Sequence, residues 1–263
     1  MDWVKPYYTR AGEYWGPTGA TPELAERLTT LERLTTPGPK RILELGAGTG
    51  EVAAIMSDAG HHVTAIEFSP TRAPNIATLA AEPRTGTLIA RQEDFYEVQL
   101  DGQFDVVCYW DGFGIGSDAD QRRLLKRISE EWLTPTGCAL IDVFSPYRWI
   151  AETGKEWTLD RNHPSHRHRQ RRRFNFDPIH NCFLDQWCPI SDETGACDES
   201  QAITQKIRCY TPSDFILLLE GTNLTLTQTE IANQPFDFQS DMATAIHPIW
   251  QAWSYLVKLT PKP

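Results

Sequence analysis

The apolar and polar positions of this chain follow a pattern that predicts an α/β fold. Residues 21–35 carry leucines at the three- and four-residue spacing of one helical face, which predicts an amphipathic helix before the first strand. Thr21 is suited to cap this helix, and Pro22 to occupy its first position. Five short apolar runs follow, with room for helices between them. These runs span residues 41–46, 62–68, 87–92, 104–110 and 138–144.

Strands that are apolar on both faces and alternate with helical stretches predict a parallel sheet covered on both sides. One such helical stretch is residues 118–133. The core pattern returns at residue 211 with a helix that Thr211 or Ser213 would cap, and with strands over residues 224–231 and 254–260. We therefore expect an α/β, doubly wound, Rossmann-like fold with a mostly parallel seven-stranded sheet.

Between residues 146 and 210 the pattern changes, because the segment is rich in tryptophan, arginine, histidine and proline. Residues 171–187 alternate as two strands around the turn residues Asp177, Pro178 and Asn181. This alternation predicts an antiparallel β lid, inserted after the fifth strand of the core.

Composition narrows the range of partners. The chain has 263 residues, of which 25 are Lys or Arg and 35 are Asp or Glu, so its formal net charge is -10 and it repels polyanions. We expect no nucleic-acid partner. The first ten residues lack the apolar core of a signal peptide, and no apolar run approaches the length of a membrane helix. We expect a cytoplasmic protein without membrane contact.

The six cysteines include no C-x-x-C pair, and four of them fall irregularly between residues 182 and 209. Irregular spacing disfavours a zinc site, and a chain without a secretory signal is a poor candidate for disulfides. We expect reduced, partly buried thiols and no metal.

A glycine-rich turn at residues 46–50 follows the first apolar run. Gly46 permits a tight bend, and Gly48 lets the backbone approach a ligand closely. A dinucleotide site has the spacing G-x-G-x-x-G or A, whereas here Glu51 occupies the place of the last small residue. A carboxylate in the first helical turn repels a pyrophosphate. The turn therefore predicts a nucleotide-like ligand without one.

Two further acids define the rest of this ligand. Glu44, at the end of the first strand, is placed to accept hydrogen bonds from an ammonium group. Glu67 ends the second strand, about 20 residues beyond the turn, where an acid binds a ribose diol. S-adenosylmethionine fits the description of a ligand with a ribose and an ammonium group but no pyrophosphate.

The motif ELGAGTG, the acid in AIEFSP and the turn QEDF resemble those of the class I S-adenosylmethionine-dependent methyltransferases of the small-molecule type, from residue 22 to near residue 259. The resemblance implies a methyltransferase that uses S-adenosylmethionine and releases S-adenosylhomocysteine. It also implies that Glu44 orients the ammonium group, that Glu67 binds the ribose, and that Asp94, with Glu93 as its competitor, meets the adenine. The cofactor-binding residues expected on this basis are Glu44, Gly46, Ala47, Gly48, Glu67, Phe68, Asp94, Phe95 and Tyr109.

The change of pattern at residue 146 and its return at residue 211 divide the chain into three parts. We expect a cap helix and the cofactor-binding half of the core in residues 1–145, the lid in residues 146–210, and the rest of the core in residues 211–263. The acceptor should meet the lid and the N-terminal aromatic residues, since the core sheet is committed to the cofactor.

The acceptor is expected to be a small molecule or peptide, methylated at O or N. Residues 109–114 resemble the turn that separates cofactor from acceptor in the family, although Trp110 is equally suited to the core. In the basic run at residues 166–174, a strand would place Arg171 and Arg173 on one face and Arg172 on the other. These arginines either bind an anionic acceptor or pair with nearby acids such as Asp185. The expected acceptor-binding residues are Tyr14, Trp110, Tyr147, Arg171 and Arg173.

No catalytic residue follows firmly from the sequence, because aligning the nucleophile, methyl group and sulfur in a dry pocket supplies much of the acceleration. The candidates for a general base are His163, His166 and Asp111. Two other functions stay open, namely an NAD(P)-dependent oxidoreductase and a cofactor-binding scaffold without turnover.

Overall fold

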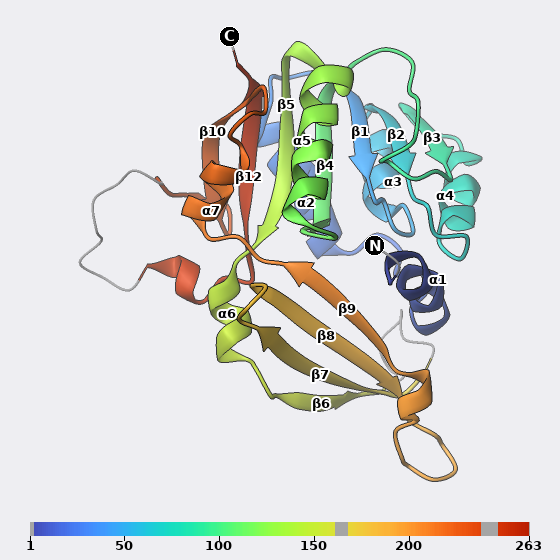
Figure 1. The fold of residues 1–263 in the computed structure, drawn as a ribbon. Helices are drawn as coiled ribbons and strands as arrows, with labels where there is room; N and C mark the ends of the chain where they lie inside the picture. The colour runs from blue at the N-terminus through green and yellow to red at the C-terminus, as the bar shows by residue number, and fades with distance from the viewer. Residues whose placement is uncertain (1–2, 161–167, 238–246, 263) are drawn as a thin grey trace.

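The structure is a computed structural model that describes residues 3–160, 168–237 and 247–262, and it divides into a large core sheet and a smaller lid sheet (Figure 1). The core sheet has the strand order β11-β10-β12-β5-β4-β1-β2-β3. Strands β1 to β5 run parallel, whereas β12 pairs antiparallel with β5 and β10. The core strands are β1 (Arg41–Leu45), β2 (His62–Ile66), β3 (Thr87–Arg91), β4 (Phe104–Phe113), β5 (Leu133–Phe144), β10 (Leu224–Ile231), β11 (Gln234–Pro235) and β12 (Ser254–Pro261).

The doubly wound α/β fold with an antiparallel lid is confirmed. The eighth strand, β11, has only two residues and extends one edge of the expected seven-stranded sheet. Strand β5 begins at Leu133, five residues before the expected start at Cys138, because its first residues already pair with the start of β4. Strand β4 likewise continues to Phe113.

Helices cover both faces of the core sheet. One face buries aromatic residues such as Trp132 and Phe215, and the other buries Leu31 and Met56. The helices are α1 (Val4–Tyr14), α2 (Pro22–Leu34), α3 (Glu51–Asp58), α4 (Ala73–Ala80), α5 (Asp118–Arg127), the π-helix Ile128–Trp132, α6 (Pro146–Ala151) and α7 (Pro212–Leu218), with 3-10 turns at Glu199–Gln201 and Pro248–Trp250.

The predicted N-terminal caps are present on helices α2 and α7. The hydroxyl of Thr21 accepts the backbone N–H of Leu24 at 3.4 Å, and Pro22 begins α2. At α7, Thr211 and Asp214 form a reciprocal capping box, so Thr211 is the cap of the two candidates. These caps fix where α2 and α7 begin.

The lid is a four-stranded antiparallel sheet that lies below the core sheet in Figure 1, beyond the end of β5, with α1 beside it. Its strands are β6 (Glu156–Leu159), β7 (Gln170–Asp177), β8 (Cys182–Pro189) and β9 (Ile203–Arg208). The expected hairpin is β7 and β8, which pair from Asp177 opposite Cys182 to Gln170 opposite Pro189. The outer strands β6 and β9 were not expected, because neither alternates clearly enough in the sequence.

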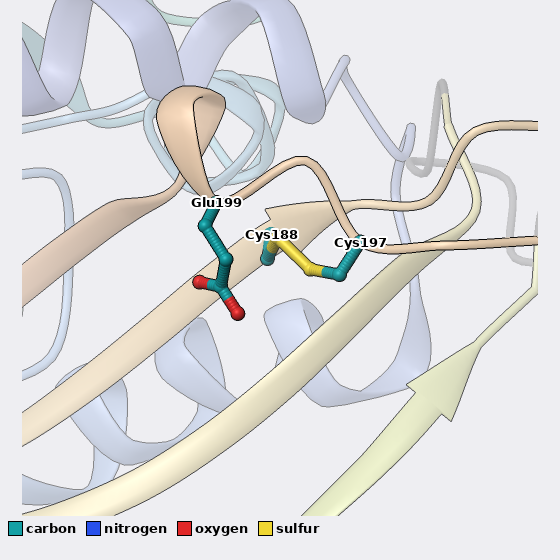
Figure 2. A group of neighbouring side chains, drawn as sticks. All are labelled: Cys188, Cys197 and Glu199. Atoms are coloured by element: carbon teal, nitrogen blue, oxygen red, sulfur yellow. A yellow bond between two sulfur atoms is a disulfide. The ribbon is translucent and has the colours of Figure 1, made fainter.

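The expectation of reduced cysteines is wrong for one pair, since Cys188 and Cys197 form a disulfide (Figure 2). The loop after β8 folds back through a bridge between Ile190 and Cys197, which brings two cysteines nine residues apart to a Cα distance of 6.0 Å. The other four cysteines, Cys108, Cys138, Cys182 and Cys209, are free and buried.

Glu199 lies beside this disulfide, and ligand atoms of the three residues lie within 4.8 Å of one another (Figure 2). The two sulfurs are bonded to each other, and the Glu199 carboxylate pairs with Arg171 at 2.7 Å. The group is therefore engaged in a covalent bond and an ion pair.

Across the described residues, no helix has the length and apolar character needed to cross a membrane.

Candidate active site

The glycine turn between β1 and α3 is tied to the end of β2. Gly46 and Gly48 have φ values of 60° and 59°, in the left-handed region that favours glycine. The backbone N–H of Gly48 donates to Oε2 of Glu67 at 2.9 Å, and the N–H of Ala47 donates to the carbonyl of Ile66 at 2.9 Å. A Cβ on Gly46 would come within 3.2 Å of the Tyr109 ring. The turn is therefore fixed in a shape that leaves Gly46 open to a ligand.

Glu67 lies at the end of β2 with both carboxylate oxygens partly used. Oε2 accepts from Gly48, and Oε1 accepts the backbone N–H of Ser69 at 2.8 Å. Burial raises the pKa of this carboxyl above its ordinary value, against the opposing effect of the backbone N–H groups and of Arg72. A carboxylate offers about four lone-pair positions, so these backbone donors leave Glu67 with acceptor capacity for a ligand such as a ribose diol.

A cavity of about 680 Å³ opens between the core sheet, α1 and the lid. The core contributes the glycine turn, the segments that follow β2 and β3, and the last part of β4 with Ile115 after it. Its core residues are Gly46, Glu67, Phe68, Arg72, Asp94, Phe95, Tyr96, Tyr109, Trp110, Asp111, Gly112 and Ile115. Its remaining residues are Val4, Lys5, Tyr7, Tyr8 and Trp15 from the N-terminal segment, and Arg172, Asp185, Trp187 and Gln205 from the lid.

The segment after β3 supplies an acid and an aromatic ring at one end of this cavity. Oδ1 of Asp94 accepts the backbone N–H of Tyr96 at 3.0 Å, and its other oxygen lies 3.6 Å from the ammonium of Lys5. The rings of Phe95 and Tyr109 meet edge to face with centroids 5.5 Å apart. Glu93, the competing acid, instead pairs with Arg91. Of Glu93 and Asp94, therefore, Asp94 is the acid that lines the cavity.

Glu44 does not line the cavity, in contrast to the role that the resemblance implies. It pairs across the sheet with Cys108, its side chain is buried, and its Oε2 has no hydrogen-bond partner among the described residues. Burial raises the pKa of Glu44 to about 8, although the charge of Arg27 opposes this shift. Ala47 and Gly48 also lie outside the cavity lining. The cofactor residues that the structure brings together are Gly46, Glu67, Phe68, Asp94, Phe95 and Tyr109.

The lid lines the cavity with an ion pair between Arg172 of β7 and Asp185 of β8. Nε and Nη2 of Arg172 donate to the two oxygens of Asp185 at 2.9 and 2.7 Å. The guanidinium carbon lies 4.3 Å from the centroid of the Trp187 ring. Burial raises the pKa of Asp185, and the hydrogen bonds from Arg172 are the largest opposing influence. The side chain of Gln205 donates to the Tyr8 hydroxyl at 2.7 Å and joins the lid to α1.

The arginines expected to bind the acceptor lie elsewhere. Arg171 pairs with Glu199 at 2.7 Å and Arg173 pairs with Glu156 at 2.8 Å, and neither lines the cavity. Strand β7 directs the face with Arg172 toward the cavity, because the same face carries Phe174, which is 3% exposed. The alternation was expected correctly, but the inner face was not.

Of the other expected residues, Trp110 and Asp111 line the cavity. The Tyr14 hydroxyl donates to the carbonyl of Gln201 at 2.6 Å, outside the lining. Tyr147 also lies outside it and packs against Trp250 at 4.6 Å between ring centroids. The candidates His163 and His166 lie outside the described residues.

Sequence reasoning missed the cavity-facing lid residues Arg172, Asp185, Trp187 and Gln205 as a group. A signal was present, because Phe174 stands two residues from Arg172 and marks the buried face of the strand. No comparable signal places Gln205, since its strand was not expected.

Comparison with known sequences finds a family described as a methyltransferase domain, which matches residues 20–229. A protein of Geobacillus sp. (strain WCH70), whose methyltransferase name is provisional, is 33% identical over 113 residues. This match spans 42% of the present chain and 45% of the relative, so the chain aligns with about half of that relative's length.

Solved methyltransferase structures share the fold over nearly the whole chain. CcbJ of Streptomyces caelestis has a TM-score of 0.75 and 18% identity, with 99% of this chain and 98% of that chain covered. CalS10 of Micromonospora echinaspora, an amino pentose methyltransferase with bound S-adenosylmethionine, has a TM-score of 0.61 and 15% identity, with 98% and 96% covered. The glycopeptide N-methyltransferase MtfA with S-adenosylhomocysteine has a TM-score of 0.57 and 21% identity, with 94% and 89% covered.

Proposed function

We propose that this chain, which belongs to the methyltransferase domain family, transfers a methyl group to a nitrogen or oxygen of a small-molecule acceptor. Its cofactor is S-adenosylmethionine, which supplies a methyl group activated by the positive charge on sulfur. The family matches residues 20–229, and the shared fold covers nearly all of this chain and of CcbJ. Both matches support the reaction class. The acceptor and the roles of individual residues are inferred from the cavity.

One observation carries the proposal, namely that the glycine turn and Glu67 open into the same cavity as the lid residues. Glu67 lines the cavity together with Gly46 and is a hydrogen-bond acceptor, which fits a ribose diol. Asp94 and Phe95 offer an acid and an aromatic ring at a second point, which fits an adenine. The protein side of the site therefore matches an adenosine without a pyrophosphate.

The start of α3 argues against a dinucleotide. Glu51 accepts the backbone N–H of Thr18 at 2.9 Å and the hydroxyl of Thr49 at 2.6 Å. The first turn of the helix is thus occupied by a carboxylate that already has two donors. A pyrophosphate at that place would meet like charge. This arrangement disfavours the oxidoreductase alternative.

The chain's own residues are suited to exclude water and to align two reactants. Tyr7 is nearly fully buried, and Tyr8 and Trp15 beside it cover the cavity from the N-terminal side, with Trp187 completing this wall from the lid. Trp15 and Trp187 meet edge to face with centroids 4.6 Å apart. Holding reactants in a dry site accelerates a displacement at carbon. We infer that the acceptor binds against these rings.

The cavity suits a small molecule that is not strongly charged. Its volume lies in the range of small-molecule sites. The positive charge of Arg172 is compensated by Asp185, so an anion is not required there. Asp185 lines the cavity, and its carboxylate is suited to accept a hydrogen bond from an amine or hydroxyl of the acceptor. MtfA acts on a glycopeptide nitrogen, and CalS10 on an amino pentose, which makes amines the first acceptors to try.

The test is a screen with S-adenosylmethionine that carries a deuterated methyl group. The protein is incubated with panels of amino sugars, aryl amines, phenols and modified peptides, and mass spectrometry looks for the added methyl and for S-adenosylhomocysteine. We expect a product from a neutral or weakly charged acceptor of small-molecule size. Methylation of nucleic acid or of large proteins alone would contradict the proposed acceptor class.

A further inference from the structure

Arg27 of α2 links Asp142 in β5 to residues 110–112 of β4, which line the cavity. Its Nη2 lies 2.7 Å from Oδ2 of Asp142 and 3.1 Å from Oδ2 of Asp111. Its guanidinium carbon lies 4.8 Å from the centroid of the Trp110 ring. The Asp142 side chain is 5% exposed, whereas that of Asp111 is 67% exposed. One guanidinium group thus joins a buried anchor to an accessible part of the site.

Residues 110–112 form an irregular turn within β4, whose backbone needs such support. Asp111 has a φ of 52°, in a region that residues other than glycine rarely adopt. The pairing of β4 with β5 shifts register between Tyr109 and Phe113, so the turn lies in an irregular part of the strand. All three residues of the turn line the cavity, but Arg27 does not. Arg27 therefore contacts residues of the cavity wall without lining the cavity itself.

The charges at this point favour a lasting ion pair. Burial opposes the charge of Arg27, but Asp142 and Asp111 together offset it and leave the pKa of the guanidinium above its ordinary value. Burial raises the pKa of Asp142 to about 6, and Arg27 is the largest opposing influence. A hydrogen bond from the backbone N–H of Asp111 also favours the charged carboxylate. Arg27 therefore keeps its positive charge beside the buried carboxyl group of Asp142.

We propose that Arg27, anchored on Asp142, is a positioning residue for methyl transfer, which holds the 110–112 turn in the shape that cofactor and acceptor meet. The inference rests on the proposed function, because it assigns that turn to the wall of the cofactor cavity. A guanidinium group can reach both acids and stack on Trp110, whereas a lysine ammonium is a single point charge. Arg27→Lys should therefore keep the charge and lose the shape of the turn.

The chain offers a matched control on the same helix. Arg33 pairs in bidentate fashion with Glu230, whose side chain is 2% exposed, so it too joins α2 to a buried acid of the core sheet. That pair lies outside the lining of the cofactor cavity. Arg27→Lys and Arg33→Lys are therefore comparable changes with different distances from the site.

Calorimetry with S-adenosylhomocysteine and thermal unfolding of the same samples test the proposal. We expect Arg27→Lys to weaken binding about fivefold or more, which corresponds to about 1 kcal/mol. Arg33→Lys should stay within about twofold of the unaltered protein. Both should lower Tm by a similar amount. Equal affinities in the two variants would overturn the inference.

A double-mutant cycle shows whether Arg27 acts through the turn. In an Asp111→Asn background, Arg27→Lys should weaken S-adenosylhomocysteine binding by less than about twofold, because the ion pair between Arg27 and Asp111 is already lost. The full loss in that background would contradict the proposal. If Arg27→Lys does not fold, Asp142→Asn and its control Glu230→Gln replace the pair with the same expected contrast. No binding by the unaltered protein would instead contradict the proposed function itself.

Discussion

The backbone N–H of Gly48 donates to the carboxylate of Glu67 across 2.9 Å, so the glycine turn after β1 is fastened to the end of β2. The same carboxylate also lines the cavity. We propose that Glu67 has two tasks, since it holds the turn and is suited to bind the ribose of the cofactor.

Replacing Glu67 by alanine should weaken S-adenosylhomocysteine binding by about 1.5–3 kcal/mol, because a charge-assisted hydrogen bond and the support of the turn are both lost. Calorimetry measures the change. Glu93→Ala is the control, because Glu93 pairs with Arg91 outside the cavity lining. An unchanged affinity in Glu67→Ala would remove this residue from the cofactor site.

The three adjacent arginines of β7 allow a test of the lid. Arg172→Lys should raise the Michaelis constant for the acceptor about three- to tenfold, since the bidentate contact with Asp185 orients that wall of the cavity. Arg171→Lys and Arg173→Lys should leave it unchanged, because their partners lie outside the cavity lining. Steady-state kinetics with the acceptor found in the screen gives the comparison. A larger effect of Arg171→Lys or Arg173→Lys would restore the anionic-acceptor hypothesis.

Glu44 should make stability fall as pH rises. Burial raises its pKa to about 8 in the folded protein, from an ordinary value of 4.5. Between those values the folded state holds the proton more tightly than the unfolded state, so its contribution is full below pH 4.5 and is lost as pH approaches 8. Each tenfold difference in proton affinity between the two states corresponds to about 1.4 kcal/mol of stability.

Glu44→Gln should therefore gain stability relative to the unaltered protein as pH increases over this window, by up to a few kcal/mol. Urea unfolding at several pH values measures the difference. A constant difference between the two proteins from pH 5 to pH 8 would show that Glu44 ionises normally in the folded state.

The Cys188–Cys197 disulfide should protect two thiols from alkylation. Denatured, unreduced protein treated with iodoacetamide should gain four labels, at the cysteines that are free in the structure, and six after reduction. The short loop closed by this disulfide should contribute about 2–3 kcal/mol to stability. Intact-mass spectrometry gives the count, and six labels without reduction would show that the bond is absent.

The sequence predicted the core of the fold well because its signals are local. The glycine turn, the caps at Thr21 and Thr211, and the apolar strands each follow from a few adjacent residues. The basis for placing Glu67 was equally local, since strand length and spacing bring it to the turn.

The lid was predicted only in part, because its inner face is set by contacts between distant segments. Arg172 faces the cavity since Phe174 is buried against other lid residues, and Asp185 meets it only through strand pairing. The disulfide likewise depends on a loop that folds back on β8. Spacing along the chain contains none of these contacts, and for that reason it led to Arg171 and Arg173 as acceptor-binding residues, although Arg172 is the arginine of β7 that lines the cavity.

The central claim is that the cavity between the core sheet and the lid binds S-adenosylmethionine. A calorimetric titration of the purified protein with S-adenosylhomocysteine, run beside one with NAD, tests it most directly. The account predicts saturable binding of S-adenosylhomocysteine with one site per chain, no comparable binding of NAD, and a marked loss of affinity in Glu67→Ala. Tighter binding of NAD than of S-adenosylhomocysteine would contradict it.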